Sequence, residues 1–172
     1  MYLHEIKPGQ RVFIDANIFV YHFSNGSRFN KSCTDFLLMV ENSIVHGVTS
    51  AAVIQEATHR LMMTEASSIL DMEVKNLPKY LKQHPAIVKQ LTRHLAVPSK
   101  IFGLNIDIIP IMPNLIEGSQ VFKTRYGLLS NDALTLKIMD EHKITILASN
   151  DLDFERIDWL KLYTPCPADN IL

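Results

Sequence analysis

The chain has no run of about 18 uninterrupted apolar residues, the length that a membrane-spanning helix requires. Its first residues, Met1 to Pro8, do not form the basic segment followed by an apolar one that is typical of a secretion signal. We therefore expect a cytoplasmic protein that does not contact a membrane. Cysteine is scarce as well, because only Cys33 and Cys166 occur, far apart and without metal-ligand spacing. This pattern indicates neither a disulfide framework nor a zinc site, and we expect both cysteines to be buried.

Acidic residues are missing from one long stretch. Between Val74 and Ile106 there is no Asp or Glu, whereas the stretch contains six cations: Lys75, Lys79, Lys82, Lys89, Arg93 and Lys100. The whole chain has a net charge of −1, so the other residues, with 11 cations and 18 acids, carry −7. Because a phosphate backbone responds to the local distribution of charge, this stretch is a candidate contact for nucleic acid. An ordinary solvated helical face explains it equally well.

The composition is that of a folded protein. Hydrophobic residues make up 47% of the 172 residues and charged residues 20%, far from the polar composition of disordered chains. This length fits one domain with a sizeable core, so we expect residues 1–172 to form a single domain.

Short apolar runs alternate with helical patterns, which predicts an α/β fold. We expect a helical stretch from Asp15 to about His46 that uses Phe36, Leu37, Val40 and Ile44. Further helices are predicted from Ala51, capped by Ser50, to about Ala66, over 67–100 with breaks near Pro78, Pro85 and Pro98, over 114–126 and over 130–142. Strands are predicted at 12–14, 47–49, 106–111, 144–148 and 160–163. Pro110 favours an edge position for the third strand, because proline cannot donate to the ladder.

Acidic side chains follow several of these elements. Asp15 follows the first strand directly, and Asp151 and Asp153 follow the strand that ends at Ala148. Asp132 lies at the start of a helix, and Glu56 lies on the flank of an apolar stripe. Parallel α/β sheets place their sites outside the carboxyl ends of their strands, so these are the acids to consider.

Each acid also has a simpler explanation. Asp15, Asn17 and Asp132 are in positions where helix caps are common, and the turn around Asp151 and Asp153 is rich in residues that favour turns. Glu56 is spaced to form an ion pair with Arg60. Their repetition at one expected edge is harder to explain this way. Packed together, such acids raise each other's pKa or require a cation, and an all-oxygen set suits Mg²⁺ or Mn²⁺.

With these residues in hand, the chain resembles the PIN-domain family, and in particular the small VapC-type ribonuclease toxins of prokaryotic toxin–antitoxin modules. Four short motifs carry the resemblance across most of the chain: Val12-Phe13-Ile14-Asp15-Ala16-Asn17, Val53-Ile54-Gln55-Glu56-Ala57, Leu128-Leu129-Ser130-Asn131-Asp132-Ala133 and Ser149-Asn150-Asp151-Leu152-Asp153-Phe154. The resemblance implies a three-layer α/β sandwich whose central, mostly parallel five-stranded sheet has strand order 3-2-1-4-5. That order would bring Asp15 and Asp151 together on adjacent strands.

The resemblance also implies an activity, the metal-dependent hydrolysis of RNA. Asp15, Glu56, Asp132 and Asp151 would hold one or two Mg²⁺ or Mn²⁺ ions, with Asp153 as the alternative to Asp151. Asn17 and Ser149 would orient ligands or water from behind. An antitoxin protein would be a partner, and a homodimer is common in this family.

One departure from the smallest toxins is the longer helical segment at about 64–100. Because this segment is also cationic, our hypothesis is that Lys75, Lys79, Lys82, Lys89 and Arg93 position RNA phosphates near the acids.

Three other functions compete with the nuclease. A non-catalytic RNA- or protein-binding member of the same fold would keep the acids only as caps and turn residues. A phospho-acceptor signalling domain also gathers acids at strand ends, but it places a Lys after its last strand, whereas Lys161 is expected within that strand. A haloacid-type phosphatase needs Asp-x-Asp, where this chain has Asp15-Ala16-Asn17.

Overall fold

A five-stranded parallel sheet forms the centre of the computed structural model, which describes residues 1–24 and 26–167. Its strands are β1 (Arg11–Ile14), β2 (His46–Ser50), β3 (Asp107–Ile109), β4 (Ile146–Ala148) and β5 (Lys161–Tyr163). They lie in the order β3-β2-β1-β4-β5, and all four neighbouring pairs are parallel. The predicted fold class and strand order are confirmed.

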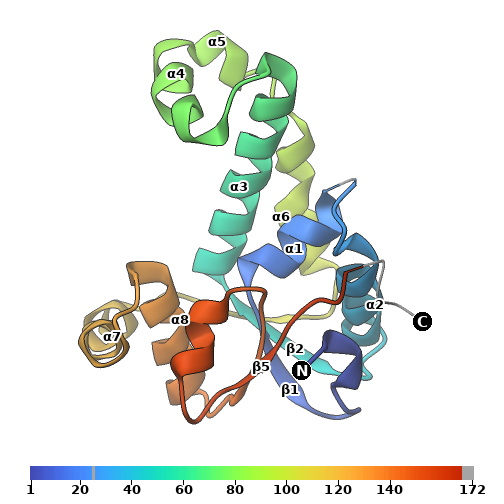
Figure 1. Ribbon diagram of the computed structural model, residues 1–172, viewed down its shortest axis with the longest axis vertical. Coiled ribbons are helices and arrows are strands. Elements are labelled where there is room, and N and C mark those ends of the chain that lie inside the picture. Colours follow the sequence, from blue (N-terminus) through green and yellow to red (C-terminus); the bar gives the residue numbers. More distant parts are fainter. Residues whose placement is uncertain (25, 168–172) are drawn as a thin grey trace.

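Helices flank the sheet (Figure 1). On one side lie α1 (Ala16–Phe23) and α2 (Asn30–Glu41), and on the other lie α7 (Pro113–Tyr126) and α8 (Ser130–Glu141). Two short 3-10 helices complete this body, η1 (Leu3–Glu5) and η4 (Leu152–Arg156). The central strand β1 contributes Val12, Phe13 and Ile14, each without exposed surface, because it is covered on both faces.

The long helix α3 (Ala51–Leu70) leads away from the sheet to a small helical lobe, which Figure 1 shows above the body. This lobe contains η2 (Val74–Asn76), α4 (Leu77–Gln83) and α5 (Pro85–Val88), and η3 (Arg93–Ala96) and α6 (Val97–Phe102) return the chain to the body. The lobe has its own buried cluster, in which Met63, Leu77, Leu81 and Leu91 pack together.

Prolines mark helix starts in this segment. Pro78, Pro85 and Pro98 each lie at one of the first two positions of a helix, where a missing N–H costs no hydrogen bond. The predicted breaks near these residues are confirmed. Within the described residues, no helix combines the length and the apolar character needed to cross a bilayer.

The predicted continuous helix from Asp15 to about His46 is wrong. The structure has two helices there, and Gly26 adopts a φ of +86° between them, a conformation that favours glycine. The second helix ends at Glu41, and Ile44, expected on the apolar stripe, is 42% exposed. Ser43 has a positive φ, which turns the chain out of the helix toward β2.

The other strand predictions differ from the structure only at their ends. The third strand covers Asp107–Ile109 at the sheet edge, so Pro110 follows it instead of interrupting it. Lys161 opens β5 and lies within the strand, as expected. Cys33 and Cys166 are both free and buried, as expected.

Gly47 in β2 gives a test of the core packing. A Cβ at this position would lie 2.5 Å from Val40 Cγ1 and 3.1 Å from Ile14 Cδ1, both buried side chains. We expect Gly47→Ala to lower the free energy of unfolding by about 1–3 kcal/mol, the usual cost of overpacking. Urea denaturation measures this change.

Gly118→Ala in α7 is the matched control. Its added Cβ would meet only the far end of the flexible Lys137 side chain, 2.7 Å from Cε. Alanine is favoured over glycine within a helix by up to about 1 kcal/mol, so stability should hold or rise. Equal stabilities for the two variants would contradict the packing described for β2.

Candidate active site

The carboxyl ends of β1 and β4 meet at one edge of the sheet, and the acidic side chains gather there. Asp15 follows β1 and Ser149 follows β4, and these strands are parallel neighbours. The backbone N–H of Asp15 donates to the carbonyl oxygen of Ala148 at 3.1 Å, which continues the ladder by one step. The predicted meeting of these two chain segments is therefore confirmed.

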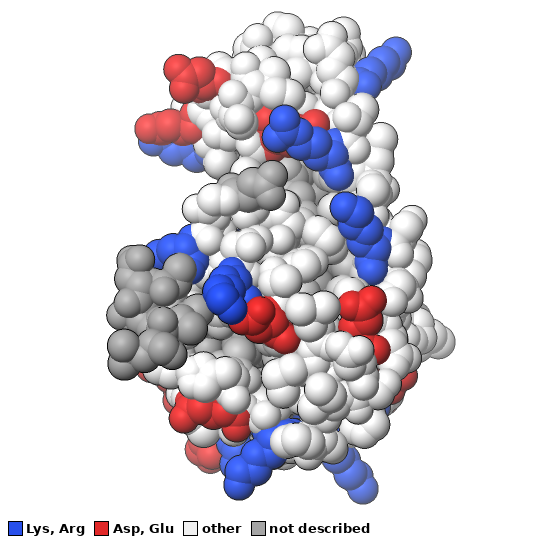
Figure 2. All heavy atoms as spheres, turned by 90° about the vertical axis from the view of Figure 1, so that its right-hand side faces the viewer, with Lys and Arg blue, Asp and Glu red and all other residues white. Residues whose placement is uncertain are grey.

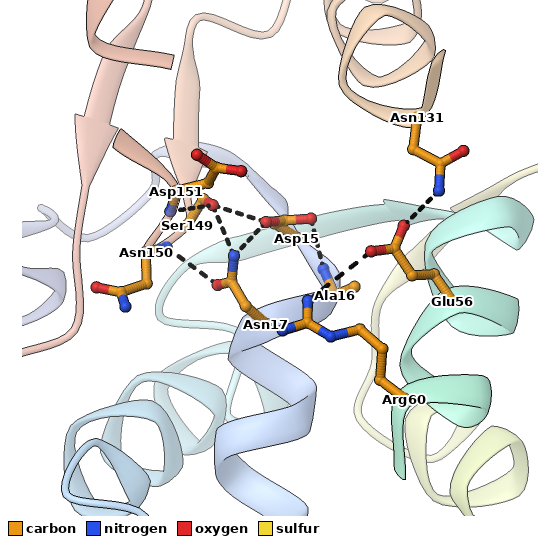
Figure 3. Close-up of polar contacts among 9 residues, drawn as sticks. All are labelled: Asp15, Ala16, Asn17, Glu56, Arg60, Asn131, Ser149, Asn150 and Asp151. Carbon is orange, nitrogen blue, oxygen red and sulfur yellow. Dashed lines mark hydrogen bonds and ion pairs between the residues drawn. The ribbon is translucent and has the colours of Figure 1, made fainter. Parts of the chain in front are cut away.

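Asp15 is both a helix cap and the centre of a polar network (Figure 3). Its Oδ1 accepts the N–H of Ala16 at 2.7 Å, which caps α1. Its Oδ2 accepts the hydroxyl of Ser149 at 2.6 Å and also the side-chain amide of Asn17. Burial raises the pKa of Asp15 to about 6, although the hydrogen bonds from Ser149 and Ala16 oppose the rise.

Asn17 and Ser149 form a buried layer behind Asp15. The Asn17 amide donates to Ser149 Oγ at 2.9 Å, and its Oδ1 accepts the N–H of Asn150 at 3.0 Å. Ser149 Oγ in turn accepts the N–H of Asp151 at 3.0 Å. These two residues therefore fix both the Asp15 carboxylate and the loop that bears Asp151, consistent with the orienting role expected for them.

Glu56 approaches from α3 on the other side of Asp15 (Figure 3). Its Oε2 accepts the side-chain amide of Asn131 at 2.8 Å, and its Oε1 lies 3.8 Å from Arg60 Nη1. The expected ion pair with Arg60 is thus present, at the site and not on a remote surface. Asn131 was missed by the sequence analysis. Its position beside Asp132 at the start of a helix was the available signal.

Asp132 is the point at which the negative charges converge. It is the third residue of α8, and it is only partly exposed. Its pKa is raised to about 6, first by burial and then by four acids: Asp151, Asp15, Glu56 and Asp153. Elements that lie far apart in the sequence therefore bring their carboxylates close enough for mutual repulsion.

Asp151 and Asp153 differ in their surroundings. Asp151 is partly buried, and its Oδ1 accepts the N–H of Asp153 at 2.9 Å. Asp153 is exposed, and its carboxylate binds the guanidinium of Arg156. Of the two, Asp151 also has the larger effect on Asp132. This geometry favours Asp151 as the fourth acid of the group.

The donor set fits a hard divalent cation, although the side chains are not yet arranged as a cage. Within the described residues, no three Asp, Glu, His or Cys side chains converge as a ready metal site. Glu56 is held by Asn131 and Arg60, and Asp15 is held by Ser149 and Asn17. An all-oxygen group whose members repel one another is nevertheless the type of site that Mg²⁺ or Mn²⁺ stabilises.

Most of the expected RNA-binding cations lie far from these acids. Lys75 pairs with Glu73 at 2.6 Å, and Lys79, Lys82 and Lys89 belong to the lobe at the distant end of α3 (Figure 1). Lys82 and Lys89 border an apolar groove there, together with Met62, Met63 and Leu81. Only Arg93 lies nearer the body, on the segment that returns from the lobe.

Known proteins with similar sequences are ribonucleases. The chain is 28% identical to Ribonuclease VapC2 of Methanocaldococcus jannaschii over 153 residues, which cover 88% of this chain and 92% of that protein. It is 24% identical to Ribonuclease VapC6 of the same organism over 156 residues, covering 88% of this chain and 95% of that protein.

Solved structures show the same fold at lower identity. VapC20 of Mycobacterium tuberculosis, a sarcin–ricin loop cleaving toxin, aligns with a TM-score of 0.58 at 12% identity, over 86% of this chain and 95% of that chain. A toxin–antitoxin complex from Klebsiella pneumoniae aligns with a TM-score of 0.52 at 18% identity, over 91% and 98%. The sequence profile of the PIN domain matches residues 12–160. This match covers all four acidic motifs, and the chain belongs to the PIN-domain family, with VapC-type ribonucleases among its relatives.

Proposed function

We propose that this protein is a divalent-metal-dependent ribonuclease that hydrolyses RNA phosphodiester bonds. The observation that carries the proposal is the proximity of Asp151, Asp15 and Glu56 to Asp132, whose pKa is raised to about 6 first by burial and then by these acids. Repulsion between these carboxylates lowers the stability of the protein unless a cation relieves it, and groups of perturbed carboxylates are typical of functional sites. The names of the curated relatives supply the substrate class.

Asp15, Glu56, Asp132 and Asp151 are the residues that would hold Mg²⁺ or Mn²⁺. When bound, such an ion generates a hydroxide nucleophile from water at neutral pH and stabilises charge on a phosphodiester. To bind it, Glu56 would exchange its contacts with Asn131 and Arg60 for the cation. Arg60 would then be released beside the acids, where its guanidinium can neutralise a phosphate oxygen.

The chain's own hydrogen bonds supply the positioning. Ala16 donates to Asp15 Oδ1, and Ser149 and Asn17 both donate to Oδ2, so both carboxylate oxygens are held in place. Because both donors are buried, the carboxylate keeps this orientation before any ligand arrives. A fixed orientation lowers the cost of assembling the reactive geometry.

Incubation of the wild-type protein with a pool of cellular RNA tests the proposal. Discrete cleavage products should appear with Mn²⁺ or Mg²⁺ and disappear when EDTA is in excess. Products that persist in EDTA would contradict metal dependence. If RNA binds but stays intact with either ion, the chain is instead a non-catalytic RNA-binding member of the family.

We further propose that the protein is the toxin of a toxin–antitoxin module, with an antitoxin as partner. VapC-type relatives and a solved toxin–antitoxin complex of the same fold support this role. Expression in a bacterial host should arrest growth. Arrest by an Asp132→Asn variant to the same extent would contradict it, because the proposed toxicity needs cleavage.

A further inference from the structure

A polar cavity at the other end of helix α1 from Asp15 takes no part in the function proposed above. Its volume is about 380 Å³, and it lies between the end of α1, the second half of α3 and the returning segment η3–α6. The side chains that matter here are Phe23, Thr64, Glu65, Ser68, Arg93 and Lys100. Figure 2 shows Lys and Arg side chains along this side of the molecule, near the narrow part that joins the body to the lobe.

Two helices connect this cavity with the acids. Helix α1 is capped by Asp15 and ends at Phe23 in the cavity wall, a length of about 12 Å at 1.5 Å per residue. Helix α3 carries Glu56, Arg60, Thr64 and Ser68 at intervals of four residues, which places them in one row along its surface. That row begins at the acids and ends in the cavity.

The one acidic side chain among the residues lining the cavity is already satisfied. Glu65 accepts the N–H groups of Thr92 and Arg93 at 3.0 and 3.1 Å, and His94 Nδ1 lies 3.4 Å away. Burial alone would raise the pKa of Glu65, but these hydrogen bonds lower it. Glu65 therefore remains ionised and fastens the backbone of Arg93 to α3.

The two cations in the cavity wall are unpaired. Within the described residues, neither Arg93 nor Lys100 has an acidic group within 4.0 Å. Both side chains are exposed, and Lys100 Nζ lies 5.6 Å from the centre of the Phe23 ring. A guanidinium and an ammonium at the mouth of one cavity, with the hydroxyl of Ser68 beside them, form a set of donors suited to a phosphate group.

We propose that this cavity binds a backbone phosphate of the RNA strand, a few nucleotides from the bond that is cleaved, through Arg93 and Lys100. This rests on the proposed function, since it assumes RNA as the substrate. The proposal assigns RNA binding to only part of the cationic segment at 64–100. Lys82 and Lys89 border an apolar groove. Arg93 and Lys100 instead border a polar cavity in line with the acids. The RNA strand would then run along the row of side chains on α3 that begins at Glu56 and ends at Ser68.

Binding of fluorescent single-stranded RNA to the full chain in EDTA tests the proposal, because no cleavage occurs there. The double variant Arg93→Ala, Lys100→Ala should weaken binding by about tenfold at low salt, and the slope of log affinity against log salt should fall by about 0.7 for each phosphate that the variant no longer neutralises. Neither substitution disturbs Glu65, which contacts only the backbone of residue 93 on that side.

Lys7→Ala with Lys161→Ala is the matched control. This pair removes the same charge from exposed positions at the amino ends of β1 and β5, the opposite edge of the sheet. Its affinity should stay at the wild-type value. Equal losses for the two pairs would show that only total charge matters, and an unchanged affinity for the Arg93 and Lys100 pair would overturn the proposal outright.

A length series separates a defined subsite from general attraction. With RNAs from a dinucleotide upward, wild-type affinity should rise in a step where the strand becomes long enough to reach the cavity, and the double variant should lack that step. Parallel curves for the two proteins would overturn the proposal. A different result would contradict the nuclease proposal alone. In that case wild-type affinity would still rise in a step with RNA length, but the RNA would stay intact in Mn²⁺.

Discussion

Asp15→Asn is expected to lower RNA cleavage at saturating Mn²⁺ by about a hundredfold or more, a loss of at least ~2.7 kcal/mol of transition-state stabilisation. The substitution removes one negative charge from the proposed cation site. It also replaces one carboxylate oxygen by an NH₂ group, which cannot accept the hydrogen bonds that Ser149 and Asn17 donate. The remaining acids would therefore bind the cation more weakly and in a less fixed geometry. Initial rates on a labelled RNA measure the effect.

The fold should survive this change, because an amide has nearly the volume of a carboxylate and can still cap α1. A cooperative thermal transition and an unchanged far-UV circular dichroism spectrum would confirm it. Asp35→Asn is the control, since Asp35 is exposed on α2 and pairs with Lys31 at 2.6 Å, away from the site. Cleavage by Asp15→Asn at the wild-type rate would refute the assignment of the site.

Asp132→Asn is expected to abolish cleavage and at the same time to stabilise the metal-free protein. The pKa of Asp132 is raised from 3.8 to about 6, so the folded state disfavours its carboxylate relative to the unfolded chain. The folded state therefore favours the protonated form of Asp132. This contribution of Asp132 to the free energy of unfolding is fully present below pH 3.8 and is lost as the pH rises through 6. At pH 7.5 the wild type is destabilised by the ionised carboxylate of Asp132, whereas the neutral amide of the variant is not charged and avoids this loss of stability.

The size of this gain is limited by solvent, because Asp132 is partly exposed. We expect the melting temperature at pH 7.5 without metal to rise by about 2–4 °C, the shift that ~1 kcal/mol produces in a domain of this size. The gain should disappear near pH 4. Added Mg²⁺ should raise the melting temperature of the wild type more than that of the variant.

Asp140→Asn provides the comparison on the same helix. Asp140 lies two turns further along α8 and is exposed, so its replacement should change neither cleavage nor the melting temperature. A variant Asp132→Asn that is inactive but no more stable than the wild type at any pH would contradict the proposed repulsion. One that is more stable and fully active would show that the charge cluster does not serve catalysis.

Local patterns predicted the strands, and the resemblance to the PIN-domain family supplied the strand order that brings Asp15 and Asp151 together. A buried parallel strand needs apolar residues on both faces, and the runs ending at Ile14 and Ala148 have them, so the acids that follow were expected at the carboxyl ends of the strands. The break after α1 was not predicted, because helical periodicity continues through a segment in which Gly26 must adopt a positive φ. Periodicity does not report such a turn.

The partners of each acid were harder to predict than the acids themselves. The bond between Asn131 and Glu56 spans 75 residues, and nothing in either local sequence indicates it. The choice between Asp151 and Asp153 likewise depends on Arg156, which turns the second of them outward. The distance of Lys79 from the site depends on the length of α3, which runs to Leu70 instead of ending near Ala66.

The hydrogen bond between Ser149 and Asp15 spans 134 residues, and β4 lies between β1 and β5 in the sheet. During synthesis, β1 and β2 can pair as soon as both have left the ribosome, but β1 lacks its other neighbour until residue 148 has emerged. A nascent chain that has already exposed Asp15, Glu56 and Asp132 therefore still lacks the serine that orients the first of them and the loop that bears Asp151. The segment that completes the proposed catalytic site is thus the last part of that site to be synthesised.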